Sequence, residues 1–384
     1  MNISSKLPDV ETSIFTVMSA LAHEHNAINL SQGFPDFQGS PELSERVCHY
    51  MRKGYNQYAP MAGVPALRQQ IAQKVALLYG IDVNPDTEIT ITSGATQGIF
   101  STIAAFIKPG DEVILFEPAY DSYRPSVLVN GGIPVVLELE APHYRIDWER
   151  VEQLISPKTR MIIINTPHNP TGTILAADDL LALAALTKGT DILVLSDEVY
   201  EHLVYDGLQH QSVLRFSDLK ERSLAVYSFG KTFHNTGWKI GYCIAPAALT
   251  QEFRKVHQFT VFSVNTPIQY ALADYLADAS HYLELNAFFQ KKRDLFLGII
   301  KDSLLKPLPC QGTYFQLFDY SAISQEGDVG FARRMTMTYG VAAIPVSVFY
   351  TQRRDDKVIR LCFAKEETTL SKAGLLLNRI GGHS

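Results

Sequence analysis

Hydrophobic positions in the middle of the chain fall into short apolar runs that alternate with segments of helical spacing. Seven runs have the length and composition of β-strands: Glu88–Thr92, Glu112–Phe116, Pro134–Leu139, Met161–Asn165, Ile192–Ser196, Leu224–Phe229 and Ile240–Ala245. Apolar residues recur every three or four positions between several of these runs, at Ala95–Ile107, Trp148–Ile155 and Asp178–Thr187. This alternation predicts an α/β fold with a seven-stranded, mostly parallel central sheet and helices on both of its faces.

The flanking regions have a different pattern. Before the alternating region, helices are predicted at Ile14–Ala27, Glu42–Met51 and Pro65–Tyr79, with an aromatic loop at Tyr55–Val64. Beyond Pro246 the spacing is helical, with a long span at Ser280–Lys301, and strand-like runs follow at Tyr314–Phe318 and Val358–Phe363. We therefore predict a large domain over residues 46–279 and a smaller α+β lobe made of residues 1–45 and 280–384.

Composition narrows the class of protein. The 384 residues are 46% hydrophobic and 19% charged, which is enough for a sizeable core. A net charge of −6 without a basic cluster argues against nucleic acid and anionic membrane surfaces as partners. The apolar runs are too short for a transmembrane helix, and the N-terminal segment lacks the pattern of a secretory signal.

The cysteines and histidines indicate a reduced, metal-free protein. Cys48, Cys243, Cys310 and Cys362 lie far apart and form no CxxC pair, so we expect reduced thiols and a cytoplasmic location. The 11 histidines show no HExxH or other ligand spacing, so no metal site is predicted.

The most informative stretch for chemistry is Ser228–Tyr242, which reads SFGKTFHNTGWKIGY. It begins where an apolar run ends and contains Lys231 and Lys239. Because α/β proteins build their sites where strands end, one lysine is a candidate amine nucleophile and the other a counter-charge for an anion. A turn with two solvated lysines is the alternative. The Gly-Lys-Thr does not complete a phosphate loop, since Ala225 stands where that loop needs glycine.

Two further strand ends carry groups suited to a phosphorylated, aromatic ligand. Thr92–Gly98 (TSGATQG) leads from a strand into a helix whose first N–H groups are free to bind an anion, and Thr96 adds a hydroxyl. Glu117–Tyr123 (EPAYDSY) places aromatic rings where they can stack on a flat ligand. An ordinary helix cap and simple packing are the alternatives for these two segments.

Three other positions add polar groups. Asn169 in NTPHNPTG can donate a hydrogen bond to a ligand oxygen, although an Asn–Pro turn is also a sufficient explanation. Asp197 in LSDEVY ends a strand and would stay ionised beside a cationic ring nitrogen, with Tyr200 one helical turn away. Arg360 interrupts the apolar run IRLCFAK, so it needs a carboxylate partner from the protein or from a ligand.

Other enzyme classes are excluded by spacing. No two glycines are separated by a single residue, so the dinucleotide-binding fingerprint is absent. Glycines four positions apart enclose Thr96 or Lys239 and never a serine, so there is no GxSxG nucleophile elbow.

Five of these segments, in this order, resemble motifs of the class I and II aminotransferases, which are pyridoxal-phosphate enzymes of fold type I. The motifs are TSGATQG, NTPHNPTG, LSDEVY, SFGKTFHNTGWKIGY and IRLCFAK, and the resemblance covers the chain from about Asn29 to the C-terminal lobe. Relatives commonly have proline at the position of His168 and asparagine at that of Thr166. Three segments, INLSQGFPDF, YNQYAP and SFGKTFHNTGWKIGY, are similar to the methionine/aromatic and kynurenine branch, which is glutamine transaminase K-like.

This resemblance implies pyridoxal 5'-phosphate as cofactor and a homodimer with shared active sites. Lys231 is implied to bind the cofactor covalently and to move the substrate α-proton, Asp197 to pair with the pyridine nitrogen, and Tyr200 to hydrogen-bond the ring oxygen. Asn169 is also implied to hydrogen-bond the ring oxygen, and Tyr120 to stack on the ring. The implied phosphate ligands are Ala95, Thr96, Ser228 and Lys239, with Tyr58 reaching in from the second subunit. Arg360, together with Asn169 and the backbone at Gly33, is implied to bind the substrate carboxylate.

The implied reaction moves the amino group of methionine or an aromatic amino acid, or of kynurenine or glutamine, to a 2-oxo acid by a ping-pong mechanism. Phe15, Phe34, Tyr58 and Tyr314 are candidates for an aromatic pocket, whereas no second arginine is evident for an acidic side chain. A β-lyase acting on cysteine conjugates is one alternative. A non-catalytic sensor with this fold is another, but no basic helix-turn-helix precedes residue 29.

Overall fold

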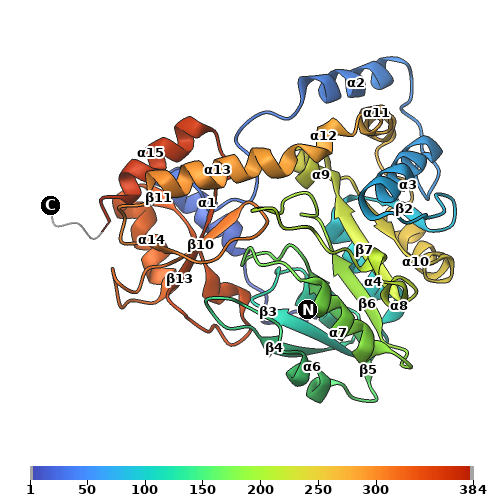
Figure 1. The fold of residues 1–384 in the computed structure, drawn as a ribbon, viewed down its shortest axis with the longest axis horizontal. Coiled ribbons are helices and arrows are strands. Elements are labelled where there is room, and N and C mark those ends of the chain that lie inside the picture. Colours follow the sequence, from blue (N-terminus) through green and yellow to red (C-terminus); the bar gives the residue numbers. More distant parts are fainter. Residues whose placement is uncertain (1–2, 381–384) are drawn as a thin grey trace.

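The computed structural model describes residues 3–380 and contains two main sheets in two lobes (Figure 1). The larger lobe holds the seven-stranded sheet, and the smaller one holds a four-stranded sheet with α14 (Asp328–Tyr339) and α15 (Glu367–Leu377). Helix α13 (Leu285–Ile299) runs from the larger lobe to the smaller one in Figure 1.

The seven-stranded sheet has the order β2-β8-β7-β6-β5-β3-β4. Its strands are β2 (Ile89–Thr92), β3 (Glu112–Glu117), β4 (Ile133–Glu138), β5 (Thr159–Asn165), β6 (Leu193–Asp197), β7 (Ser223–Ser228) and β8 (Gly241–Ile244). β8 is antiparallel to both of its neighbours, and the pairs among the other strands are parallel. The predicted seven-stranded, mostly parallel sheet is therefore confirmed.

Both faces of this sheet are buried, which explains why its strands are apolar at nearly every position. In β5, Ile162 and Ile164 belong to one core, whereas Met161 and Ile163 belong to the core on the opposite face. Helix α4 (Gly94–Phe106) covers the second face together with α10 (Ala247–Thr260).

The chain contains further helices before, between and after the strands of this sheet. They are α1 (Ile14–Glu24), α2 (Pro41–Arg52), α3 (Pro65–Tyr79), α5 (Tyr123–Val129), α6 (Trp148–Leu154), α7 (Ala177–Thr187), α8 (Ser217–Lys220), α9 (Phe229–Thr232), α11 (Thr266–Leu276) and α12 (Ser280–Leu283), with the 3-10 turns η1 (Val213–Arg215) and η2 (Thr236–Trp238). Local signals set several boundaries: Ser40 accepts a hydrogen bond from the Leu43 N–H before α2, and α3 ends at the left-handed Gly80.

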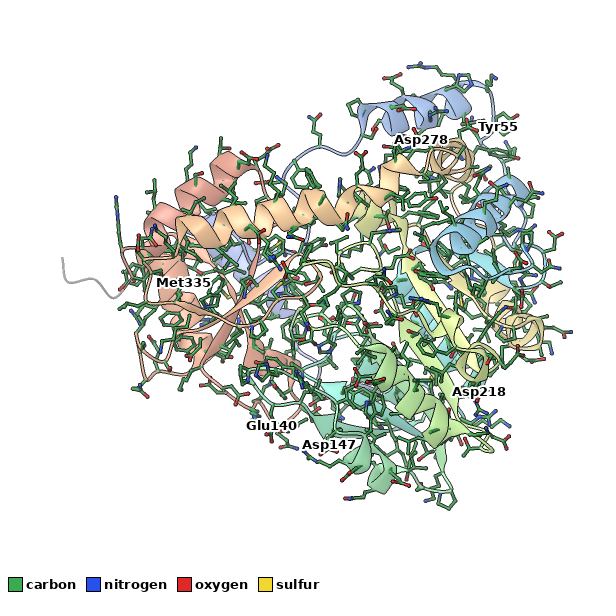
Figure 2. The ribbon with its side chains drawn as sticks, in the orientation of Figure 1. Tyr55, Glu140, Asp147, Asp218, Asp278 and Met335 are labelled. Atoms are coloured by element: carbon green, nitrogen blue, oxygen red, sulfur yellow. The ribbon has the colours of Figure 1, made fainter. Side chains whose placement is uncertain are left out.

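The smaller lobe is built from segments distant in sequence. Its sheet has the order β12 (Ile344–Pro345), β13 (Val358–Cys362), β10 (Phe315–Asp319) and β9 (Lys306–Pro307). β1 (Ile28–Asn29) pairs in parallel with β11 (Val341–Ala342), which joins the N-terminal segment to this lobe. The 3-10 turn η3 (Val346–Phe349) follows β12. Met335, labelled in Figure 2 on α14, is fully buried in the core.

Some predicted boundaries were wrong. The single span expected at Ser280–Lys301 is two helices, α12 and α13, which are separated at Glu284 (φ −90°, ψ −6°). Helix α5 was not predicted, since YRPSVLV contains proline and two valines, which favour other conformations.

Within residues 3–380, no helix is both long and apolar enough to cross a membrane. The same residues contain no group of three or more His, Cys, Asp or Glu side chains placed to bind a metal ion.

Candidate active site

A cavity of about 140 Å³ lies where the carboxyl ends of β5, β6 and β7 meet the start of α4. Such strand ends are where open α/β sheets bind their ligands. The structure brings nine of the predicted site residues to its wall: Ala95, Thr96, Tyr120, Asn169, Asp197, Tyr200, Ser228, Lys231 and Lys239. They come from separate motifs, so the fold itself assembles the site.

Lys231 lies on the short helix α9, directly after β7. Its Nζ donates hydrogen bonds to the Gly33 carbonyl (3.1 Å) and the Tyr314 hydroxyl (2.9 Å). Burial lowers the pKa of Lys231 to about 8, and the positive charges of Arg360 and Lys239 act in the same direction. About a tenth of this amine is therefore neutral at pH 7, far more than for a lysine of ordinary pKa, and the neutral form is the one that acts as a nucleophile or base.

Asp197 is the last residue of β6 and is almost fully buried. Its Oδ2 accepts a hydrogen bond from the Tyr123 hydroxyl (2.6 Å), and its Oδ1 accepts one from the Val199 N–H (3.3 Å). Burial raises the pKa of Asp197 to about 6, although these two hydrogen bonds oppose the shift. A carboxylate in this setting is stabilised by a cationic partner, such as a protonated ring nitrogen.

The first turn of α4 and Lys239 form the polar end of the cavity. Gly94 has φ of +74°, and a Cβ at this position would lie 3.4 Å from the Lys239 Nζ. The leading N–H groups of a helix lack intrahelical acceptors, and Ala95 and Thr96 lie in this turn. Together with Ser228 and Lys239, they form a donor-rich site for an anion.

Arg360 lies in the middle of β13, opposite Leu317 and Ile344, and is only 1% exposed. Its Nη1 donates to the Asn169 Oδ1 (2.7 Å) and its Nη2 to the Ser31 carbonyl (3.2 Å). Its Nε is buried without a hydrogen-bond partner among the described residues. This donor and the unneutralised charge fit a ligand carboxylate.

The three other predicted residues, Arg360, Tyr58 and Gly33, are not among the residues that line the cavity. Tyr58 is 81% exposed, and its ring contacts that of Phe262 edge-on at 5.0 Å instead of lining the cavity of its own chain. Gly33 reaches the site through its carbonyl, which also accepts a hydrogen bond from the Tyr314 hydroxyl (2.5 Å). A Cβ at Gly33 would lie 2.7 Å from the Phe315 ring, so the backbone at Gly33 packs closely against that ring.

Sequence reasoning missed several residues of the site. Tyr123 was considered only as an aromatic of EPAYDSY, yet its hydroxyl holds Asp197. Asn165 lines the cavity, and its Nδ2 donates to the Asp197 carbonyl (2.8 Å). Their positions at strand ends were the available signal, but which polar group faces which depends on the packing.

The donor set fits pyridoxal 5'-phosphate. A buried amine, a buried carboxylate and an anion site surround one cavity, and Tyr120 lies on its wall. Gly94 has no side chain to fill the anion site, and the Arg360 Nε, which has no hydrogen-bond partner within residues 3–380, is left for a substrate carboxylate.

Comparisons with known proteins agree with this site. The model of the family "Aminotransferase class I and II" matches residues 25–373. The chain is 52% identical to the methionine aminotransferase of Escherichia coli over 98% of each chain. It is 34% identical to a kynurenine–oxoglutarate transaminase of Dictyostelium discoideum, over 94% of this chain and 92% of that one.

Solved structures give the same result. A crystal structure from Escherichia coli, described as having a methionine aminotransferase function, matches with a TM-score of 0.97 at 52% identity, covering 99% of this chain and 100% of that one. The Thermus thermophilus aspartate aminotransferase with maleate matches with a TM-score of 0.90 at 31% identity, covering 99% of this chain and 100% of that one. The chain therefore belongs to the class I and II aminotransferases and is a pyridoxal 5'-phosphate-dependent transaminase.

Proposed function

We propose that this aminotransferase transfers the amino group of methionine or an aromatic amino acid, including kynurenine, to a 2-oxo acid by a ping-pong mechanism. The observation that carries the proposal is the presence of Lys231 and Asp197 on the wall of one cavity, with Arg360 joined to that wall through its hydrogen bond to Asn169. The guanidinium of Arg360 packs on the Phe315 ring. The 52% identity to a methionine aminotransferase supports methionine as a donor and favours transfer over β-lyase chemistry.

In this proposal, Lys231 moves the proton at the substrate α-carbon. The bound cofactor supplies an electron sink for the negative charge that develops at that carbon. Burial raises the neutral fraction of the Lys231 amine, and this neutral form accepts the proton. Gly33 and Tyr314 hold its Nζ in place. Asp197, fixed by Tyr123, pairs with the ring nitrogen and keeps the ring cationic.

The other cavity residues bind and orient. We assign Asn169 and Tyr200 to the ring oxygen and Tyr120 to the ring face. The geometry of Asn169 supports this role. Its Oδ1 accepts a hydrogen bond from Arg360, so its Nδ2 is left to donate to another acceptor. The proposed phosphate ligands are Ala95, Thr96, Ser228 and Lys239, with Tyr58 from the second subunit.

Arg360, with the backbone at Gly33, is the proposed site of the substrate carboxylate. The guanidinium Cζ lies 3.8 Å from the centroid of the Phe315 ring and 5.2 Å from that of Phe15. Aromatic walls beside the carboxylate site favour apolar and aromatic side chains over acidic ones, because a second carboxylate would be buried without a partner.

We also propose a homodimer and a cytoplasmic location. The exposure of Tyr58 and of Phe259 (87%) supports a surface that a second copy covers. The free thiols of Cys48, Cys243, Cys310 and Cys362 support a reducing compartment.

The visible spectrum of the purified protein tests the function. A yellow cofactor band should bleach when methionine or phenylalanine is added without an acceptor, and should return on addition of a 2-oxo acid. A band that no such amino acid changes would contradict the proposed substrates, and failure to form a band with added pyridoxal phosphate would contradict the role of Lys231.

A further inference from the structure

Glu117 is a buried carboxylate whose two oxygens are bound by one residue of the other lobe. It ends β3, is only 3% exposed, and lies immediately before the segment that carries Tyr120. Its Oε2 accepts a hydrogen bond from the Thr351 N–H (2.7 Å), and its Oε1 accepts one from the Thr351 Oγ1 (2.6 Å). Burying a carboxylate is unfavourable unless its oxygens are hydrogen-bonded, so the position of Glu117 depends on Thr351.

Further contacts join the same two segments. The Ala119 N–H donates to the Phe349 carbonyl (3.0 Å), and the Tyr350 hydroxyl donates to the Leu139 carbonyl (3.1 Å). Arg354 lies 3.8 Å from Glu140, which Figure 2 labels where the larger lobe approaches the smaller one. These contacts form a bridge between the end of β3 and residues 349–354.

The far end of this bridge is fixed within the smaller lobe. Phe349 belongs to η3, which follows β12 of the four-stranded sheet. In the same turn, Ser347 donates to both oxygens of Asp328 at the start of α14, from its N–H (2.7 Å) and from its Oγ (2.6 Å). A displacement of the Glu117 end is therefore transmitted to a rigid segment of the smaller lobe.

Each end of the bridge also contacts the active site. On one side, Ala119 directly precedes Tyr120, which lies on the cavity wall. On the other side, the Phe349 ring lies 5.4 Å from the Arg360 Cζ and 6.0 Å from the Phe15 ring. The bridge thus joins the wall beside the cofactor ring to the wall beside the guanidinium.

We propose that Glu117 and Thr351 are positioning residues that hold the carboxylate site at Arg360 in register with the ring site at Tyr120. Neither residue contacts the reacting atoms. The proposal rests on the proposed function, in which Arg360 binds the substrate carboxylate and Tyr120 contacts the ring. Since transamination requires the α-carbon to lie beside Lys231, the distance between these two sites decides whether a bound amino acid is correctly placed.

The test compares two substitutions at the exposed Thr351 in the holoenzyme. Thr351→Val keeps the shape and the backbone N–H but removes the hydroxyl, and Thr351→Ser is the matched control that retains it. The ligand is 3-phenylpropionate, a carboxylate without an amino group, whose binding is followed by the change that it causes in the visible spectrum. Cofactor dissociation and the thermal midpoint are measured in parallel.

We expect Thr351→Val to weaken 3-phenylpropionate binding by up to about tenfold, a limit set by the free energy of the lost hydrogen bond to the Glu117 carboxylate. The cofactor dissociation constant should stay within about twofold of wild type, since the ring and phosphate contacts remain, and Thr351→Ser should behave like wild type. Glu117→Gln should weaken 3-phenylpropionate binding in the same way, because the glutamine amide places an N–H donor opposite a donor of Thr351.

Two results would overturn the proposal. Unchanged 3-phenylpropionate binding in Thr351→Val with a lower thermal midpoint would show a purely structural role, as would equal losses of carboxylate and cofactor affinity. Arg360→Ala distinguishes this failure from failure of the proposed function. If that variant binds 3-phenylpropionate as tightly as wild type, the role of Arg360 is wrong and the positioning proposal falls with it.

Discussion

At the scale of single residues, the site depends on charges that burial has shifted away from their ordinary states. Lys231 is held partly neutral, Asp197 is harder to ionise, and burial also lowers the pKa of Arg360 to about 10. Burial makes the charged form of each group unfavourable, and for Asp197 and Arg360 a ligand of opposite charge relieves this cost. These two side chains therefore favour charged ligand groups for the same reason that they destabilise the fold.

The pH dependence of stability reports the state of Lys231. Its pKa in the folded protein, about 8, lies below the ordinary 10.5, so between these values the unfolded chain binds the proton more. The free energy of unfolding of the cofactor-free protein should therefore rise with pH across this window, by roughly 3 kcal/mol relative to Lys231→Met. Denaturant titrations of both proteins at pH 7–10.5 measure this difference. If the difference in unfolding free energy does not change with pH, the pKa of Lys231 is not lowered in the folded protein.

Replacing Lys231 by alanine removes the proposed base and the covalent attachment. We expect Lys231→Ala to have no measurable steady-state transamination while still binding the cofactor, since the phosphate and ring contacts are unchanged. Equilibrium dialysis gives the cofactor affinity and a coupled assay gives turnover. Appreciable turnover in this variant would contradict the role of Lys231.

Arg360 should separate substrate binding from cofactor binding. Arg360→Ala is expected to weaken amino-acid binding by about 2–5 kcal/mol, because it removes the buried partner of a carboxylate. Cofactor affinity should change little. Arg360→Lys is the control for charge alone, since lysine cannot reproduce the two-pronged geometry of the guanidinium. Spectral titration with methionine measures the loss, and equal losses of both ligands would make Arg360 a structural residue.

At the scale of elements, the anion site depends on how α4 begins. Gly94 has a left-handed backbone (φ +74°), and so does Lys239 (φ +54°). Both residues lie at the anion site, where the Lys239 side chain lies beside Gly94. The left-handed conformation is unfavourable for residues with a side chain, which explains glycine at the start of the helix. The first turn of α4 is thus adapted to its ligand at a cost in local stability.

Gly94→Ala tests this relation. Alanine in a left-handed conformation costs about 1–2 kcal/mol, and its Cβ would lie against the Lys239 side chain. We expect a lower thermal midpoint in the cofactor-free protein and weaker binding of pyridoxal phosphate. Gly237→Ala is the matched control, since a Cβ there has no atom within 4 Å. Similar effects of both substitutions on cofactor binding would argue against a specific role for Gly94.

The elements that sequence predicted well are those stabilised by local patterns. The strands of the larger sheet were found because each is a short apolar run, and several end at a polar residue, such as Asp197 after Leu193–Ser196. The pairing of β1 with β11 was out of reach, because two-residue strands carry no periodic signal and their partners are some 300 residues apart. The antiparallel direction of β8 likewise depends on a turn through η2 and not on its composition.

The site residues that could be predicted are likewise those with a local signal in the sequence. Lys231, Asp197 and Arg360 stand out as charges at the ends or in the middle of apolar runs. Tyr123 and Thr351 do not, because a tyrosine or threonine is unremarkable in sequence and acquires its role only by contact with Asp197 or Glu117. Residues that act through another residue require the structure.

At the scale of the whole molecule, one surface is unusual. Tyr58, Phe259 and Phe262 are 81%, 87% and 58% exposed, and Phe262 also has a left-handed backbone (φ +64°). Exposed aromatic rings in contact with one another are typical of protein interfaces. Because the proposed phosphate site uses Tyr58 of a second copy, the expected assembly is a symmetric dimer in which each chain completes the site of its partner.

Complementation between two defective chains tests this assembly. A Lys231→Ala chain lacks the amine but offers an intact Tyr58, whereas a Tyr58→Ala chain has the amine but offers no tyrosine. In a mixed dimer one site receives both defects and the other receives none. After equal amounts are mixed, unfolded and refolded together, half of the dimers are mixed, so about a quarter of all sites should be fully active.

The outcome separates the two arrangements of Tyr58. If it serves its own chain, every site in the mixed dimer carries one defect, and activity stays at the average of the two parent proteins. A refolded wild-type sample gives the yield of active sites, and size-exclusion chromatography gives the oligomeric state. Because Tyr58→Ala is expected to weaken cofactor binding while Lys231→Ala abolishes turnover, the assay is made at a cofactor concentration that saturates wild type and not Tyr58→Ala. Activity above the parental average under these conditions requires Tyr58 to act across the dimer interface.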